Sequence, residues 1–171
     1  MLHSTETGLL RVQHDIASEL NKNHAMLFVM LDLSSAFDTI DHEQLLTLLH
    51  DEYGVREMAL SWFRANLEDR THCVQTDSQA SATIPLQSGV PQGSVLGPAM
   101  FTLYTTPMQR IFKRQGINYH KYANDIQLYA SYNPAKPGDQ VETARRLTDC
   151  IGEVRRWMAV RMMKLNDEKL R

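Results

Sequence analysis

The sequence predicts an α+β domain in which helices pack on one face of a mainly antiparallel sheet. Residues 120–130 form two short segments rich in aromatic and branched residues that meet at Asn124–Asp125, the pattern of a β-hairpin with a two-residue turn. The apolar run 25–32 is typical of a strand buried on both faces. Apolar residues at helical spacing surround these strands, so helices are expected to cover them.

The N-terminal part of the sequence predicts one helix before the apolar strand and two helices after it. Residues 4–20 fit an amphipathic helix capped by Ser4 or Thr5, with apolar positions at Leu9, Leu10, Val12, Ile16 and Leu20. Asp41 followed by Gln44 resembles a capping box, which predicts a helix that buries four leucines of 45–49 and ends before Gly54. A further helix over 56–67 is expected to direct Met58, Trp62 and Phe63 inward.

The middle of the chain predicts a hairpin, a fixed loop and a helix. Segments 71–76 and 82–87 flank the polar turn 77–81. The stretch 88–98, Ser-Gly-Val-Pro-Gln-Gly-Ser-Val-Leu-Gly-Pro, follows, and its glycines and prolines predict a loop that lets a substrate approach the backbone. Ser94 and Pro98 are then expected to start a helix that Pro107 ends or kinks, with apolar residues Met100, Phe101, Leu103 and Tyr104.

The C-terminal part predicts one long helix and a closing strand. Lys136-Pro137-Gly138 marks the break before the helix. Its inward positions are expected at Ala144, Leu147, Ile151, Val154 and Met158. Residues 162–165 then read as a strand.

Composition limits the class of protein. With 171 residues, 43% of them apolar, the chain is long enough for one compact domain with its own core. The start has neither a basic leader nor a long apolar segment, so we expect no membrane association and an intracellular protein of the nucleus or cytoplasm. Cys73 and Cys150 are far apart, which predicts two reduced core thiols and no zinc site.

Charge is unevenly distributed along the chain. Residues 1–108 hold 5 Lys/Arg against 13 Asp/Glu, and residues 109–171 hold 13 against 7. The basic half could face a phosphate backbone. It could equally be a solvated helix surface, because several of its arginines follow a helical pattern (Arg145, Arg146, Arg155 and Arg156).

Three motifs carry the chemistry. Asp32 ends the apolar strand and is followed by Leu-Ser-Ser-Ala-Phe-Asp, the loop 88–98 comes next, and Tyr-Ala-Asn-Asp occupies 122–125. In this order and approximate spacing they resemble the reverse transcriptase palm of non-LTR retrotransposons, over nearly the whole chain. The family pattern in the third motif is Tyr-Ala-Asp-Asp, and this sequence departs from it at Asn124.

The resemblance implies a single polymerase palm domain over residues 1–171, with the end of the fingers region at its N-terminus and the thumb absent. It implies an RNA-directed DNA polymerase that uses an RNA template, a DNA primer and deoxynucleoside triphosphates. The fingers and thumb regions of the parent protein, which this palm would need as partners, would be missing from these residues.

The resemblance also implies a site. Asp32, Asn124 and Asp125 would be catalytic, and Asp32, the Leu33 carbonyl and Asp125 would hold two Mg²⁺ ions, with Mn²⁺ as a substitute. Mg²⁺ pairs roughly 3.5–4 Å apart suit phosphoryl transfer because they stabilise the attacking and leaving oxygens together. By the same resemblance, the nucleotide would contact Leu33, Ser35, Ala36, Phe37, Gln92 and Gly93.

Asn124 weakens the expected activity. Its amide oxygen can occupy a coordination position but brings no negative charge, so weak or absent polymerisation is expected. The alternative is a catalytically inactive relic or nucleic-acid-binding module that keeps the palm fold. A third interpretation, a signalling enzyme with a related palm that converts nucleotides without a template, is disfavoured by the Pro-Gln-Gly loop.

Overall fold

The structure is a computed structural model that describes residues 5–34, 37–77, 79–90 and 93–166. The chain divides into two compact units, which are described separately. The first comprises Met1–Ser34, Pro107–Val160 and Lys164–Arg171, and the second comprises Ser35–Thr106 and Arg161–Met163. Among the described helices, none combines the length and the apolar character that crossing a membrane requires.

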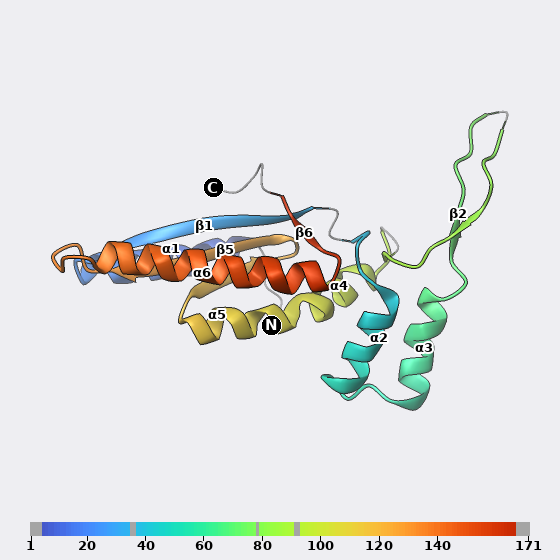
Figure 1. The fold of residues 1–171 in the computed structure, drawn as a ribbon, viewed down its shortest axis with the longest axis horizontal. Helices are drawn as coiled ribbons and strands as arrows, with labels where there is room; N and C mark the ends of the chain where they lie inside the picture. The colour runs from blue at the N-terminus through green and yellow to red at the C-terminus, as the bar shows by residue number, and fades with distance from the viewer. Residues whose placement is uncertain (1–4, 35–36, 78, 91–92, 167–171) are drawn as a thin grey trace. The chain divides into compact units, whose positions relative to one another are not determined.

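The first unit is built on an antiparallel sheet (Figure 1). Within the described residues its strands are β1 (Ala25–Ser34), β4 (Asn118–Tyr122), β5 (Asp125–Tyr132) and β6 (Lys164–Leu165), in the order β4-β5-β1-β6. Every neighbouring pair is antiparallel. This arrangement confirms the mixed class with an antiparallel sheet, and the closing strand is shorter than predicted.

The hairpin turn is one residue earlier than the sequence suggested. Tyr122 at the end of β4 pairs with Asp125 at the start of β5, so the two turn residues are Ala123 and Asn124. Ala123 takes the positive φ of 50° that a tight hairpin turn demands of one residue. Asp125 is therefore a strand residue, and the prediction of an Asn124–Asp125 turn was wrong.

Helices lie on both faces of this sheet, whereas the sequence predicted them on one face. α6 (Asp139–Val160) packs on β5 and β6, and α5 (Gln109–Gln115) packs on α6 and β4. α1 (Thr5–Asn21) packs on β1 and β4, and its Asp15 accepts a hydrogen bond from the Tyr129 hydroxyl. Because side chains alternate along β5, the buried Ile126 and Leu128 face the opposite side from Tyr129.

The buried stripe of α6 differs from the predicted one by a small rotation. Leu147, Val154 and Met158 are buried as expected. Ala144 is exposed and Ile151 half-buried, and Thr143 and Cys150 are buried in their place. Apolar spacing located the helix, but the direction of its stripe depends on the sheet that it covers.

Two apolar segments of the first unit are less buried than predicted. In β1 only Leu31–Leu33 are buried, while Phe28 and Met30 are 38% and 41% exposed. Phe28 stacks on Tyr129, on the face where α1 packs, and this face is incompletely covered by the described residues. Along α1, Val12 is buried, and three leucines are more than half exposed (Leu9, Leu10 and Leu20). The prediction of a strand buried on both faces was therefore wrong.

The second unit contains α2 (His42–Asp51), α3 (Glu57–Leu67), β2 (Thr71–His72), β3 (Ile84–Pro85) and α4 (Gly97–Thr105). The helix expected after Asp41 is confirmed, because the Asp41 carboxylate accepts a hydrogen bond of 2.8 Å from the Gln44 amide. The four predicted leucines of α2 are buried. The Ser94 hydroxyl accepts from the Gly97 amide at the start of α4, which gives way to a 3₁₀ turn at Thr106–Met108 around Pro107, as predicted.

Several side chains of the second unit that the sequence predicted to be buried are exposed or half-buried. In α3, Met58 and Trp62 are 86% and 51% exposed and Phe63 is half-buried, because the helix packs on α2 along the side of Leu67. The predicted hairpin forms with strands of two residues each, β2 and β3. Cys73 in this segment is exposed, so it is not the core thiol that was predicted, whereas Cys150 is buried.

Candidate active site

Two carboxylates meet where neighbouring strands end. Asp32 on β1 is the direct cross-strand partner of Asp125, the first residue of β5. Residues in such a pair project from the same face of the sheet. Asp32 is 9% exposed, and Asp125 is exposed. Because like charges directly opposite each other destabilise a sheet, this pair is a cost unless donors or a cation offset it.

Amide groups hold both oxygens of the Asp32 carboxylate. The Asn124 Nδ2 donates to Oδ1 at 2.8 Å, and the Asn166 Nδ2 donates to Oδ2 at 3.2 Å. The backbone joins the same three segments, since the Asn166 amide donates to the Asp32 carbonyl at 2.9 Å. The Leu33 amide donates to the Asn124 carbonyl at 3.3 Å. The hairpin turn and the end of β6 therefore fix the position of Asp32.

Asn166 was not identified as a site residue from the sequence. It directly follows β6, whose Leu165 pairs with Leu33, one residue beyond Asp32. That register brings Asn166 beside the Asp32 carboxylate. Only the pairing of β6 with β1 reveals this, because a polar residue after a two-residue strand is not distinctive by itself.

The donor set fits Mg²⁺. In the part of the chain that the structure describes, no group of three or more His, Cys, Asp or Glu side chains is arranged for a metal ion. Mg²⁺ does not need one, because it usually takes one or two carboxylates and completes its shell with water and substrate phosphates. Asp32 and Asp125 supply two carboxylates on one face. Rotation of the Asn124 amide would exchange its donor nitrogen for an acceptor oxygen.

The predicted nucleotide-contacting residues are only partly described. Ser35, Ala36 and Gln92 lie outside the described residues. In the second unit, Phe37 is half-buried, and its ring centroid lies 5.0 Å from that of Phe101. Gly93 has a φ of 78°, and a Cβ built on it would meet nothing within 4 Å.

Loop 88–90 is tied to residues 38–42, the segment that leads into α2 and includes its first residue. The His42 Nε2 donates to the Gly89 carbonyl at 2.7 Å. The Gly89 amide donates to the Ile40 carbonyl at 2.8 Å, and the Ser88 hydroxyl donates to the Asp38 carbonyl at 3.1 Å. Gly89 has a φ of 88°, and a Cβ there would lie 3.2 Å from the Asp38 backbone, so glycine is required. Sequence patterns gave no sign of the His42 contact.

Two of the arginines that the sequence offered as phosphate contacts have partners in the chain. Arg145 forms ion pairs with Glu142 and Asp149 on the same helix. The Arg146 guanidinium donates to the carbonyls of Gln115 and Gly116, both at 3.0 Å. For these two residues the contacts favour a structural surface role.

Comparison with known proteins identifies similar sequences. The profile of the family described as reverse transcriptase (RNA-dependent DNA polymerase) matches residues 2–171. The probable RNA-directed DNA polymerase from transposon BS of Drosophila melanogaster is 26% identical over 172 residues, which cover 98% of this chain and 18% of that protein. The RNA-directed DNA polymerase from mobile element jockey of the same species is 30% identical over 106 residues, covering 62% of this chain and 11% of that protein.

Solved structures resemble the fold. Apo telomerase from Candida tropicalis, truncated from its C-terminal domain, gives a TM-score of 0.71 at 16% identity, over 99% of this chain and 35% of that chain. Telomerase from Candida albicans, in complex with a TWJ fragment of telomeric RNA, gives 0.69 at 11% identity, over 99% of this chain and 31% of that chain. At these identities the likeness shows the fold alone. The chain spans less than a fifth of the first curated relative, at 18% of its length.

Proposed function

Because this chain belongs to the reverse transcriptase (RNA-dependent DNA polymerase) family, we propose that Asp32 and Asp125 form its catalytic centre. The proposed reaction adds a deoxynucleotide to the 3′-hydroxyl of a DNA primer on an RNA template. The cross-strand pairing of these two carboxylates carries the proposal, because it brings two negative charges to one face of the sheet, where they disfavour each other unless donors or a cation offset them.

Asp32, the Leu33 carbonyl and Asp125 would hold two Mg²⁺ ions, or Mn²⁺ ions. When bound, such ions supply charge stabilisation for the attacking and leaving oxygens of the phosphoryl transfer. The chain itself supplies position. The backbone bonds from Leu33 to Asn124 and from Asn166 to Asp32 fix the end of β1 against the hairpin turn and the end of β6. A cation would replace the amide donors that now hold the Asp32 oxygens.

Asn124 reduces the charge of this centre. Its side chain lies against Asp32 and donates a hydrogen bond where the family pattern has a carboxylate. We therefore propose that this copy binds divalent ions more weakly than a centre with three carboxylates, and that its polymerisation is impaired.

The residues that the family resemblance assigns to nucleotide binding complete the proposed site. Leu33, Ser35, Ala36, Phe37, Gln92 and Gly93 are proposed to contact the nucleotide. We propose that the chain is a palm domain with the end of the fingers region, and that it acts together with the fingers and thumb of a longer parent protein. The small share of the relatives' length that the chain spans supports this.

One observation favours a non-catalytic alternative. Both oxygens of the Asp32 carboxylate accept hydrogen bonds from amide side chains, which already offset its charge. In a relic or nucleic-acid-binding module that keeps the palm fold, these hydrogen bonds would be enough to accommodate the Asp32 carboxylate, and no metal ion would be needed.

Primer extension on an RNA template separates the two functions. The palm is joined to the fingers and thumb of a related element and assayed with Mg²⁺, Mn²⁺ and EDTA, with an Asp32→Asn variant as the matched control. Metal-dependent extension that Asp32→Asn abolishes supports the polymerase. If no extension occurs, even with Asn124→Asp, the non-catalytic alternative is correct.

A further inference from the structure

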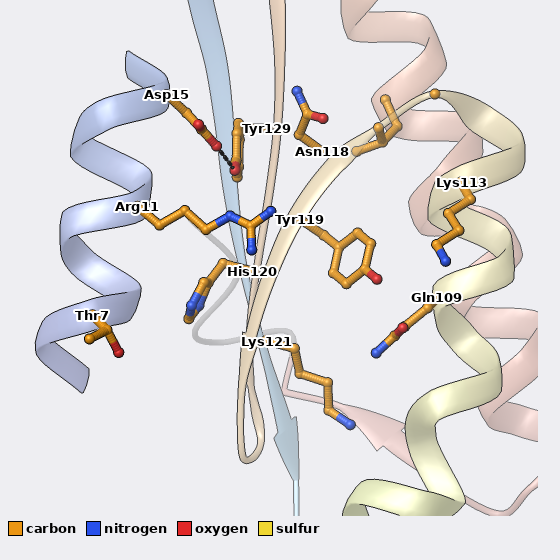
Figure 2. Close-up of a pocket in the computed structure, with 12 residues that line it drawn as sticks. Thr7, Arg11, Asp15, Gln109, Lys113, Asn118, Tyr119, His120, Lys121 and Tyr129 are labelled. Atoms are coloured by element: carbon orange, nitrogen blue, oxygen red, sulfur yellow. Dashed lines mark hydrogen bonds between the residues drawn. The ribbon is translucent and has the colours of Figure 1, made fainter. Parts of the chain in front are cut away.

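A groove of about 700 Å³ lies along β4, the edge strand of the sheet in the first unit. α1 forms one wall and α5 the other, and β4 passes between them (Figure 2). Asn118 and His120 face the α1 side, and Tyr119 and Lys121 face the α5 side, because side chains alternate along the strand. The groove is distinct from the Asp32 carboxylate, which does not line it.

The charged side chains of the lining are predominantly basic. Arg11 comes from α1, Lys113 from α5, and His120 and Lys121 from β4. Asp15 is the one carboxylate of the lining, and it accepts a hydrogen bond from the Tyr129 hydroxyl. Within the described residues Lys113 makes no ion pair, so its charge is available to an incoming anion.

Lys121 adds an independent indication. It is half-buried, and burial lowers its pKa from 10.5 to about 8. A phosphate near the amine would favour its charged form and so raise this pKa again.

We propose that this groove binds a single strand of nucleic acid through its phosphates, at a site separate from the pair Asp32 and Asp125. Basic side chains from three elements line the two walls and the strand between them, as a backbone that carries successive phosphates requires.

The rest of the lining favours a nucleic-acid strand over other anions. His120 and Tyr119 line the groove among the cations, with the Tyr119 ring packed against Phe112 at a centroid distance of 4.9 Å, and rings of this kind can stack on bases. The amides of Gln109 and Asn118 can hydrogen-bond to the edges of bases. The groove follows β4, and this strand leads to the turn that contains Asn124.

Binding of a fluorescent single-stranded RNA oligonucleotide to residues 1–171 tests the proposal by anisotropy over a range of salt concentrations, in EDTA. The groove variant carries Arg11→Gln and Lys113→Gln. The control variant carries Arg155→Gln and Arg156→Gln, an equal loss of charge at exposed positions of α6 outside the groove. Thermal unfolding verifies that both variants fold.

The groove variant is expected to bind at least about tenfold more weakly. For single strands the slope of log affinity against log salt changes by about 0.7 for each phosphate contact, so it should fall by about 1.4 in this variant and stay unchanged in the control. Equal weakening of both variants would overturn the proposal, because it would indicate a general charge effect. Unchanged binding by the groove variant would overturn it as well.

Competitors identify the source of the phosphates. Unlabelled oligonucleotide should displace the probe, and a nucleoside triphosphate or poly-glutamate at equal charge should not. Displacement by the triphosphate would assign the groove to a free nucleotide, and displacement by poly-glutamate would assign it to an acidic peptide; either result overturns the proposal.

Acetylation of the unmodified protein gives a readout that depends on no variant. The oligonucleotide should protect Lys113 and leave Lys136, which pairs with Asp139, unaffected. Lack of protection at Lys113 would contradict the proposal. Because these measurements detect binding in EDTA, their failure leaves the catalytic proposal for Asp32 intact.

Discussion

His42 and Gly89 are joined by a hydrogen bond of 2.7 Å between the ring Nε2 and the backbone carbonyl, across 47 residues of sequence. His42 is 9% exposed, so the carbonyl would lose a partner that water could not fully replace. His42→Ala should lower the free energy of unfolding by about 1–3 kcal/mol, the cost of an unsatisfied buried acceptor. His42→Gln keeps a donor and should cost less. Urea unfolding measures both, with the exposed His72→Ala as control; equal stability of all three variants would contradict the prediction.

Asn124→Asp should restore polymerisation. If the missing carboxylate removes several kcal/mol of transition-state stabilisation, the rate should rise on the order of 10² to 10⁴-fold, at about 1.36 kcal/mol per tenfold change. The measurement is primer extension at fixed Mg²⁺ in the palm joined to fingers and thumb. Far-ultraviolet circular dichroism should show an unchanged fold. Similar rates for the two versions would mean that the centre tolerates an amide.

Phe37→Val tests sugar discrimination. By family resemblance the ring closes the pocket beneath the deoxyribose, where a 2′-hydroxyl would collide with it. In a version that carries Asn124→Asp, the valine should admit ribonucleotides, measured as the ratio of kcat/KM for the two sugars. Phe37 also contacts Phe101. Unchanged discrimination together with lower stability would assign Phe37 to the core.

Residues 1–171 alone should not extend a primer, even with Asn124→Asp. Positioning of two substrates accounts for roughly 7–11 kcal/mol of such a reaction, and the proposed fingers and thumb would supply much of it. The exposed apolar side chains of α1 and α3 should also cause association at high concentration. The comparison is with the same palm joined to fingers and thumb. Equal activity of the short chain would show that the palm is self-sufficient.

Lys121→Met should stabilise the first unit near neutral pH. The pKa of Lys121 is about 8 in the fold and 10.5 in the unfolded chain, so the unfolded chain binds more protons between these values. The stability cost of the charged lysine is complete below about pH 8 and disappears as the pH approaches 10.5. The variant should gain roughly 1–3 kcal/mol at pH 7 and lose this advantage over that window. A pH-independent difference in unfolding free energy would refute the prediction.

Local chemistry explains which elements could be predicted from the sequence. Asp41 and Gln44 are three residues apart, and the cap that they form depends on no distant segment. Asp32 could be recognised as a strand-end carboxylate because it ends an apolar run. Asp125 was placed in the turn, whereas it lies at the start of β5. Asn166 could not be recognised, because its contact with Asp32 requires the pairing of β6 with β1.

Burial was less predictable than secondary structure. The apolar spacing of α3 and α1 identified both helices, but it does not say what covers each face. Trp62 and Leu10 are therefore exposed in helices that were correctly located. The contact between His42, the first residue of α2, and Gly89 joins a helix start to a distant loop, and neither periodicity nor capping gives a signal for it.

The length of the turn at Ala123 and Asn124 determines which face of the sheet receives the Asp125 carboxylate. Side chains alternate along a strand, so a single inserted residue in that turn would slip the register and reverse every side chain of β5. Leu128 would then leave the core, and Asp125 would project away from Asp32. The chain therefore cannot lose the alignment of its two carboxylates by slippage without also exposing its core, which ties the geometry of the centre to the folding of the sheet.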